Sequence, residues 1–243
     1  MSTGCGVWCV GYRRCLMRNT FLLPLFPLNV VLYPGMLLPL HIFEPRYRIM
    51  LQKCLAEEGK FGVVLIEHGK PEDDIAHPCK IGTIGKIMQV QKLERGEMYV
   101  WVLGTERFEI ESYYLTADEY LMGRIRLLTD TPLDPLLSSV RLQTLVQSFQ
   151  TYLDLLTTLN DKDRATVHME LANDPAHFSF QIAATLDIAL AEKQKLLELD
   201  NVQERLATEQ AILERETDYL RRLLASMRMR IQHLPWGGEV NLN

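Results

Sequence analysis

The sequence predicts an α+β protein in which a strand-rich first part is followed by a helical second part. Two observations predict this division. Between residues 21 and 130, short apolar runs are separated by turn residues, a pattern typical of closely spaced strands. After Pro132, apolar residues recur at the spacing of helical turns. The 243 residues suffice for one large domain or two modest ones that bury a core.

We expect four segments along the chain: a disordered leader at 1–20, a β subdomain at 21–130, an α-helical subdomain at 131–232 and a loose tail at 233–243. The leader contains three arginines and no acidic residue, which weakly resembles a signal peptide. The proline-broken run after it argues against that interpretation. An over-extended start, with Met17 as the true initiator, is another interpretation.

The β subdomain opens with an apolar run from Phe21 to Phe43 that contains no Asp, Glu, Lys or Arg. Its length would suit a membrane-spanning helix. Four prolines and Gly35 argue against such a helix, because an interior proline removes a helical hydrogen bond and clashes with the preceding turn. We therefore expect buried strands joined by tight turns, and no association with a membrane.

One helix is expected within the β subdomain, between Pro45 and Gly59. Glu44 and Pro45 suit its start, because a carboxylate favours the positive end of the helix dipole and proline is tolerated at the first position. Its apolar stripe would consist of Tyr47, Met50, Leu51, Cys54 and Leu55. Cys54 is then a core residue rather than a nucleophile. Phe43, which ends the apolar run, is expected to anchor in the core.

The remaining strands follow at short intervals. FGVVLI at 61–66 is a short apolar run. Residues 81–93 and the run MYVWVLG flank a turn at 94–97, which is the pattern of a hairpin. Residues 107–115 and 120–128 complete the series, and the stretch 129–134 after them is an unpatterned junction.

The second part begins with a helix at about 136–159. Asp174 and Pro175 then mark a helix start, as N-cap and first helical residue. A short helix at 192–199 precedes a long one at 202–232, in which apolar residues repeat every seven positions. Two glutamates, Glu209 and Glu216, interrupt the complementary series, so a two-stranded coiled coil is not expected. We expect its N-terminal half to pack in the bundle and its C-terminal half to project.

Charge and cysteine content exclude several classes of protein. The formal net charge is −5 and no basic-aromatic cluster is present, which argues against nucleic-acid binding. Five cysteines without regular spacing do not indicate a disulfide framework. No Cys or His pair at zinc-finger spacing follows Cys5 and Cys9, so no metal site is expected. Free thiols in a reducing cytoplasm are the expected state.

Catalytic motifs are largely missing. The sequence has no phosphate-binding loop, no HExxH and no GxSxG. His168, Met169 and Glu170 match the H-x-E of a zinc deaminase, but no PCxxC follows. His41 and Glu44 could form an acid–base pair, although a structural role at a strand–helix junction is the simpler interpretation. We therefore expect neither enzymatic activity nor a cofactor.

The stretch LPLFPLNVVLYPGMLLPLHIFEPRYRIM at 23–50 resembles the amino-terminal substrate-binding domain of the Lon proteases, in the form carried by small stand-alone Lon-domain proteins. The resemblance continues in GTIGKI at 82–87, GTERFEI at 104–110 and the helical stretch 172–206, and covers about 22 to 225. It implies a PUA-like β barrel followed by an α-helical bundle with a long C-terminal helix. It also implies a turn at Pro34 and Gly35 between the first two barrel strands.

In Lon proteases this domain helps to select unfolded or tagged substrates, and the ATPase and Ser–Lys peptidase modules lie elsewhere. The resemblance therefore implies a non-catalytic polypeptide-binding or adaptor protein linked to protein quality control or proteolysis. The candidate partner-binding surface consists of His41, Glu44 and Arg46. Three alternatives remain: an accessory subunit that acts in trans with an ATP-dependent protease, an RNA-binding PUA-like module, and an unrecognised hydrolase built on His41 and Glu44. The sequence does not predict an oligomeric state.

Overall fold

The computed structural model describes residues 20–68, 77–131, 138–159, 172 and 174–232. The expected leader (except Thr20), the tail and the motif at His168 lie outside the described residues. Within them the protein is a mixed α/β molecule with a seven-stranded sheet and five α-helices. The strands are β1 (Thr20–Leu28), β2 (Leu37–Ile42), β3 (Lys60–His68), β4 (His77–Pro78), β5 (Ile81–Lys92), β6 (Met98–Leu115) and β7 (Leu121–Leu127). The α-helices are α1 (Pro45–Ala56), α2 (Ser138–Leu159), α3 (Pro175–Thr185), α4 (Leu190–Glu198) and α5 (Val202–Gln232).

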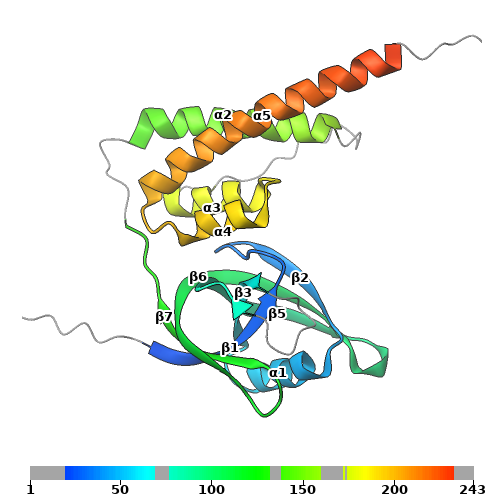
Figure 1. Ribbon diagram of the computed structural model, residues 1–243, viewed down its shortest axis with the longest axis vertical. Coiled ribbons are helices and arrows are strands. Elements are labelled where there is room, and N and C mark those ends of the chain that lie inside the picture. The colour runs from blue at the N-terminus through cyan, green and yellow to red at the C-terminus, as the bar shows by residue number, and fades with distance from the viewer. Residues whose placement is uncertain (1–19, 69–76, 132–137, 160–171, 173, 233–243) are drawn as a thin grey trace, which may run out of the picture.

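The sheet follows the order β1-β7-β6-β5-β3-β4, and β2 pairs with β6 beside this path. A parallel pairing between β1 and β3 joins two strands of the path, so the hydrogen-bonded path through five strands returns to β1. Figure 1 shows these strands curving around one interior, with α1 below them and α3 and α4 above.

The turn at Pro34 and Gly35 forms between β1 and β2, as expected. Gly35 has a φ of +82°, which glycine adopts without a steric penalty. Its N–H donates to the Gly104 carbonyl oxygen at 2.9 Å, and Met36 N–H donates to the Tyr33 carbonyl at 3.1 Å. The turn therefore fastens the start of β2 to β6.

Helix α1 confirms most of the expected stripe. Glu44 is its N-cap residue and Pro45 occupies the first turn, while Tyr47, Met50, Leu51 and Cys54 are buried. Leu55, the fifth member of the stripe, is exposed. The prediction for Phe43 is wrong, because its side chain is 57% exposed. Side chains of β2 alternate between the two faces of the sheet. Leu38 and Ile42 point inward, and Phe43 continues the outward set.

Residues 98–104 and 107–115, expected as separate strands, form the single strand β6. Its first half pairs with β2 and β5, and its second half with β5 and β7. Because each half is hydrogen-bonded on both sides, the chain stays extended through Gly104. A Cβ at this glycine would collide with the Tyr33 backbone, so the close approach of the β1–β2 loop requires glycine here.

The helical part packs around one core. Asp174 caps α3 by accepting a hydrogen bond from His177 N–H at 3.0 Å. On α5, Leu206, Leu213 and Leu220 are buried, whereas Met227 is 46% exposed. Figure 1 shows the C-terminal end of α5 extending past the other helices, as expected from its sequence.

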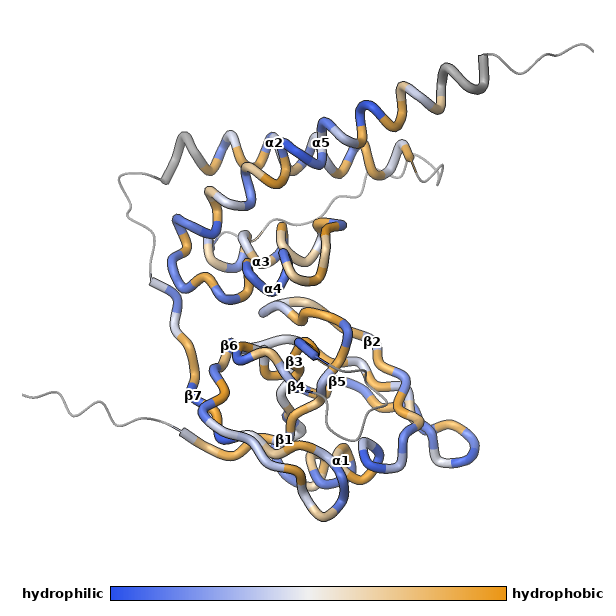
Figure 2. The backbone as a smooth tube through the Cα atoms, in the orientation of Figure 1, coloured by the Kyte–Doolittle hydropathy of each residue, from blue (hydrophilic) through white to orange (hydrophobic). Residues whose placement is uncertain are grey.

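The same core reaches into the strand-rich part. Val31, Tyr33, Leu65 and Cys79 belong to one hydrophobic cluster with residues of the four C-terminal helices. Figure 2 shows hydrophobic residues on the segments where the sheet and the helices meet. Tyr33 extends this contact, because its hydroxyl donates to the Lys193 carbonyl oxygen at 2.8 Å. The helices therefore lie against the strands through a shared apolar and hydrogen-bonded contact.

Candidate functional site

The exposed side of the β2–β6 pair carries a row of large side chains. Residues of β2 and β6 that lie directly opposite each other share a face of the sheet. The opposed pairs on the exposed side are Leu37 with Leu103, Pro39 with Trp101, and His41 with Tyr99. We call these six residues and Phe43 the outer face.

Backbone hydrogen bonding explains why these side chains gather closely. Gly104 N–H donates to the Met36 carbonyl oxygen at 2.9 Å. Hydrogen-bonded pairs alternate along an antiparallel ladder, so the three pairs of the outer face occupy the intervening positions. Opposed side chains lie closest at those positions. Pro39, which has no N–H, is tolerated there because this N–H would point away from β6.

His41 lies within an aromatic group on the outer face. Its ring centroid is 4.7 Å from that of Tyr99 and 5.7 Å from that of Phe43. Its Nε2 is 2.8 Å from Glu97 Oε2, across the β2–β6 pair. Glu44, which the sequence offered as one possible partner of His41, accepts from Arg46 instead, so the acid–base pair of His41 and Glu44 does not form. The imidazole is held by a carboxylate that sequence spacing did not indicate.

Glu44 and Arg46 form a separate pair at the start of α1. Arg46 Nε donates to Glu44 Oε2 at 2.9 Å, and the guanidinium lies 4.8 Å from the centre of the Tyr47 ring. Both side chains are partly buried. Of the three predicted surface residues, the structure thus places His41 on the outer face and binds the other two to each other.

The outer face is apolar over most of its extent. Leu37, Phe43 and Tyr99 are among the exposed large hydrophobic residues. On the far side of β6, Gln89 and Gln91 of β5 lie opposite Trp101 and Tyr99, and a register shift at this point leaves Met88 54% exposed. Contiguous exposed apolar side chains often mark a binding surface.

Sequence reasoning missed Tyr99, Trp101 and Met88. The available signal was the alternation in MYVWVLG at 98–104. Tyr99 and Trp101 occupy odd positions and point to one face of the strand. Met98, Val100 and Val102 occupy even positions and point to the other face. The valines and Met98 are buried, which leaves the aromatic parity facing out. Met88 gave no such signal, because its exposure follows from the register shift between β5 and β6.

A second polar cluster lies at the contact between strands and helices. Arg107 of β6 donates to the Leu197 carbonyl oxygen at 2.7 Å and to Asp130 Oδ1 at 2.8 Å. Arg205 of α5 donates to the same Asp130 oxygen at 3.0 Å and stacks 4.0 Å from the centre of the Phe180 ring. Both arginines are buried. We call Arg107, Asp130 and Arg205, with Ser179 and Glu209, the junction cluster.

The junction cluster ends in a buried carboxyl group. Arg205 Nε donates to Ser179 Oγ, and Ser179 Oγ donates to Glu209 Oε1, both at 2.7 Å. Burial raises the pKa of Glu209 to about 8, against the lowering effects of the Ser179 hydrogen bond and the Arg205 charge. Because all these side chains except the partly exposed Asp130 are buried, the cluster is suited to fixing the helices on the strands rather than to receiving a substrate.

The described residues offer little for metal or nucleophilic chemistry. No group of three His, Cys, Asp or Glu side chains in this part of the chain is placed to hold a metal ion. Cys54 and Cys79 are buried free thiols. Burial raises the pKa of both thiols to about 11, which disfavours the reactive thiolate. Among the helices described, none is long and apolar enough to cross a membrane.

Comparisons with known proteins agree on one family. The model of the ATP-dependent protease La (LON) substrate-binding domain matches residues 22–215. The Lon protease of Escherichia coli K12 is 30% identical over 208 residues, which are 82% of this chain and 25% of that protein. The Lon protease of Brevibacillus choshinensis is 28% identical over 200 residues, again 82% of this chain and 25% of that protein. The chain thus spans about a quarter of these relatives.

Two solved structures share the fold. A Lon N-terminal domain protein from Xanthomonas campestris superposes with a TM-score of 0.58 at 24% identity, covering 79% of this chain and 98% of that one. The N-terminal domain of the Mycobacterium avium complex Lon protease gives a TM-score of 0.60 at 17% identity, covering 80% of this chain and 98% of that one.

Proposed function

Because this chain belongs to the family of Lon substrate-binding domains, we propose that it is a non-catalytic protein that binds polypeptides. The observation that supports this function most directly is the match of the substrate-binding family model to residues 22–215. The chain acts by recognition: it holds a client polypeptide and leaves any cleavage to another protein. The proposed place of binding is the outer face.

The chemistry of the outer face suits unfolded clients. Leu37, Phe43 and Tyr99 present apolar area to water, and an unfolded chain exposes the apolar side chains that would cover them. Tyr and Trp are also enriched at protein interfaces, because they combine a large apolar surface with a polar tip. His41 and Glu97 add a polar pair at one end of the face, where they can bond to the client backbone.

The polar surface expected from the sequence fits this proposal in part. We keep His41 as a contact residue of the outer face. Glu44 and Arg46 bond to each other at the start of α1, so their proposed contribution is to hold the segment after Phe43 in place. Substitution of His41 is therefore expected to weaken client binding more than substitution of Glu44.

We also propose that the protein consists of a β barrel and a helical bundle. The closed path β1-β7-β6-β5-β3-β1 supports a PUA-like β barrel. The packing of α2 to α5 around one core supports an α-helical bundle. We assign the barrel to residues 21–130 and the bundle to residues 131–232.

We link the binding function to proteolysis in the cytoplasm, in protein quality control, because the relatives that match are Lon proteases. A second candidate follows from the same names: the chain is an accessory subunit that delivers clients in trans to an ATP-dependent protease. The two candidates share the outer face and differ in whether a protease is a partner. Co-purification with an ATP-dependent protease separates them.

The proposed function is tested with a permanently unfolded client, reduced and carboxymethylated α-lactalbumin, by fluorescence anisotropy. We expect saturable binding to the native protein. The affinity should fall about tenfold or more in the double variant Leu37→Ser/Tyr99→Ser, because the substitutions remove apolar anchors of the interface. Tyr219→Ser, which replaces a more exposed tyrosine on α5, should leave binding unchanged. The double variant should melt within a few degrees of the native protein, because exposed side chains contribute little to stability. Equal binding by all three proteins would reject the outer face as the site.

A further inference from the structure

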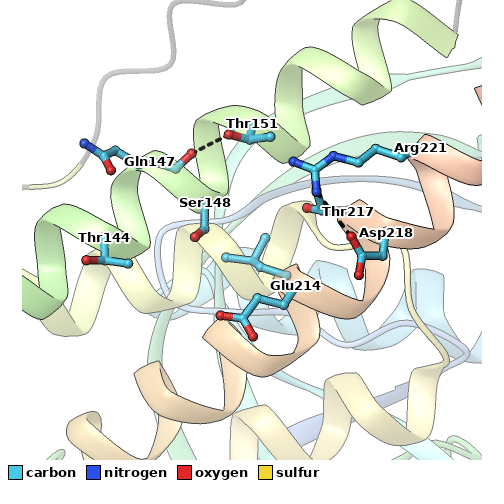
Figure 3. A pocket seen from close by; sticks show the side chains of 9 residues that line it. Thr144, Gln147, Ser148, Thr151, Glu214, Thr217, Asp218 and Arg221 are labelled. Atoms are coloured by element: carbon cyan, nitrogen blue, oxygen red, sulfur yellow. Dashed lines mark hydrogen bonds and ion pairs between the residues drawn. The ribbon is translucent and has the colours of Figure 1, made fainter.

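Helices α2 and α5 line an open pocket of about 360 Å³ in the helical part of the molecule. Figure 3 shows Ser148 and Thr151 projecting into it from α2, and Glu214, Thr217 and Asp218 reaching it from α5. None of these residues belongs to the outer face or to the junction cluster. The pocket is therefore separate from the outer face and has its own chemistry.

Hydrogen-bond acceptors dominate the lining. Gln210 Nε2 donates to Ser148 Oγ at 3.1 Å and to Glu214 Oε1 at 2.7 Å. Thr151 Oγ donates its proton to the Gln147 carbonyl oxygen at 2.9 Å, which leaves its lone pairs as acceptors. With the carboxylates of Glu214 and Asp218, the pocket presents negative charge and neutral acceptors together. Such a set favours a cationic donor.

Thr217 contributes a hydroxyl group to the pocket. Its side chain is 6% exposed, and no hydrogen bond joins its hydroxyl to another residue in the part of the chain that the structure describes. Figure 3 shows this hydroxyl facing the space between the two helices. Because this hydroxyl opens onto the pocket, it is available to accept a hydrogen bond from a bound donor.

The protein itself places a guanidinium at the mouth of the pocket. Arg221 Nη1 donates to Asp218 Oδ1 at 3.2 Å, one turn along α5. More than half of each side chain is exposed, so this pair contributes little to stability and exchanges easily with another cation. Arg221 thus shows that the pocket mouth can hold a guanidinium group. It also competes with any other guanidinium for Asp218.

We propose that the α2–α5 pocket binds an arginine side chain of a polypeptide, through Thr217, Asp218 and the hydroxyl row of α2. The guanidinium donates to Thr217 Oγ and to the Asp218 carboxylate, while Arg221 swings into solvent. The site is separate from the outer face, so it recognises a different feature of a polypeptide from exposed apolar side chains.

The test uses the whole chain labelled with ¹⁵N and titrated with N-acetyl-arginine amide, with N-acetyl-citrulline amide as a neutral probe of the same shape. We expect saturable shifts in the amide signals of residues 144–151 and 213–221 with the arginine probe only. Because the attraction is partly ionic, binding should weaken as salt is raised.

The proposal predicts that two substitutions weaken binding of the arginine probe and that a third strengthens it. Thr217→Val should weaken binding about three- to tenfold, the effect of one hydrogen bond. Asp218→Asn should weaken it about two- to fivefold, since the exposed charge is screened. Arg221→Gln should tighten it, because the internal competitor is removed. Thr208→Val, at an exposed threonine of α5 outside the pocket, is the matched control. Absence of saturable shifts, equal shifts with citrulline, or tighter binding without the Thr217 hydroxyl would each overturn the proposal.

Discussion

At the scale of single residues, strand alternation rather than hydrophobicity decides which aromatic side chains are buried. Phe43 and Phe61 are equally apolar, yet Phe43 is 57% exposed and Phe61 is fully buried on β3. We predict that Phe61→Ala lowers the free energy of unfolding by about 3–5 kcal/mol, as for other buried aromatic residues. Phe43→Ala should change it by about 0.5 kcal/mol or less. Urea unfolding of both variants measures the difference, and comparable losses would contradict the exposure of Phe43.

Glu209 should make stability depend on pH. Its pKa is near 4.5 when unfolded and about 8 when folded. Between these two pH values the folded state binds more protons than the unfolded state. Protonation of Glu209 therefore stabilises the folded state fully below the lower pKa, and this stabilisation disappears as pH rises through the upper pKa. Glu209→Gln, which keeps an acceptor for Ser179, should flatten the decline in melting temperature between pH 5 and pH 8.5. Glu204→Gln, a substitution at an exposed position of α5, should keep the native slope.

Sequence patterns predicted burial well where the buried side chains lie on one helix. Tyr47, Met50, Leu51 and Cys54 follow from helical spacing alone. The partner of His41 does not follow in this way, because Glu97 lies 56 residues away and reaches it only through the register of β2 with β6. Sequence spacing suggested Glu44 instead. Side-chain pairs across a sheet depend on register, which a single sequence does not encode locally.

At the scale of elements, α5 has two halves with different roles. Leu213 is fully buried against the bundle, whereas Met227 lies on the projecting end and is 46% exposed. We predict that Leu213→Ala costs about 2–5 kcal/mol of stability. Met227→Ala should cost about 0.5 kcal/mol or less. Chemical unfolding measures both, and a large loss in the Met227 variant would show that the projecting end is packed.

The start of α3 depends on one side chain. Asp174 accepts a hydrogen bond from His177 N–H, and Pro175 supplies the helical φ of the first turn. Asp174→Ala should destabilise the protein by about 0.5–2 kcal/mol, the usual effect of losing an N-cap. Asp174→Asn, which retains a capping oxygen, should recover most of this loss. Thermal melts of the two variants test the assignment, which fails if they are equally destabilised.

Helices were easier to predict than strands for a physical reason. Helix starts depend on neighbouring residues, so Glu44 with Pro45 and Asp174 with Pro175 located α1 and α3. The length of β6 depends on distant partners instead, because β2, β5 and β7 pair with successive parts of it. No local signal showed that 98–104 and 107–115 would join.

At the scale of the whole molecule, the junction between strands and helices is held more firmly than its sequence indicates. Thr131 N–H donates to the Asp200 carbonyl oxygen and Leu128 N–H to the Arg107 carbonyl oxygen, both at 2.9 Å. Asp130 also accepts from Arg107 and Arg205. Within the unpatterned stretch 129–134, Asp130 is therefore bonded to both parts, and Thr131 is bonded to the helical part.

We predict that limited proteolysis of the native protein spares the bonds between residues 128 and 131. A protease can cleave only after the backbone hydrogen bonds of this stretch have broken. The buried side chains of Arg107 and Arg205 oppose this opening, because both bond to Asp130. Arg107→Met should accelerate cleavage at this stretch, because Asp130 loses one of its two cationic partners. Mass spectrometry locates the cut. Rapid cutting of the native chain between residues 128 and 131 would show that the junction cluster does not hold the two parts together.

The most direct test of polypeptide binding at the outer face is a map of client contact on the native protein. Methyl signals of Leu37 and Leu103 on the outer face, and of Met88 beside it on β5, are followed by NMR during titration with reduced, carboxymethylated α-lactalbumin, and Met227 serves as a distant exposed reference. Binding at the outer face should broaden or shift the first three signals with a common saturation curve and leave Met227 unchanged. Saturable binding that leaves these three signals unmoved would contradict the claim that the outer face receives the client.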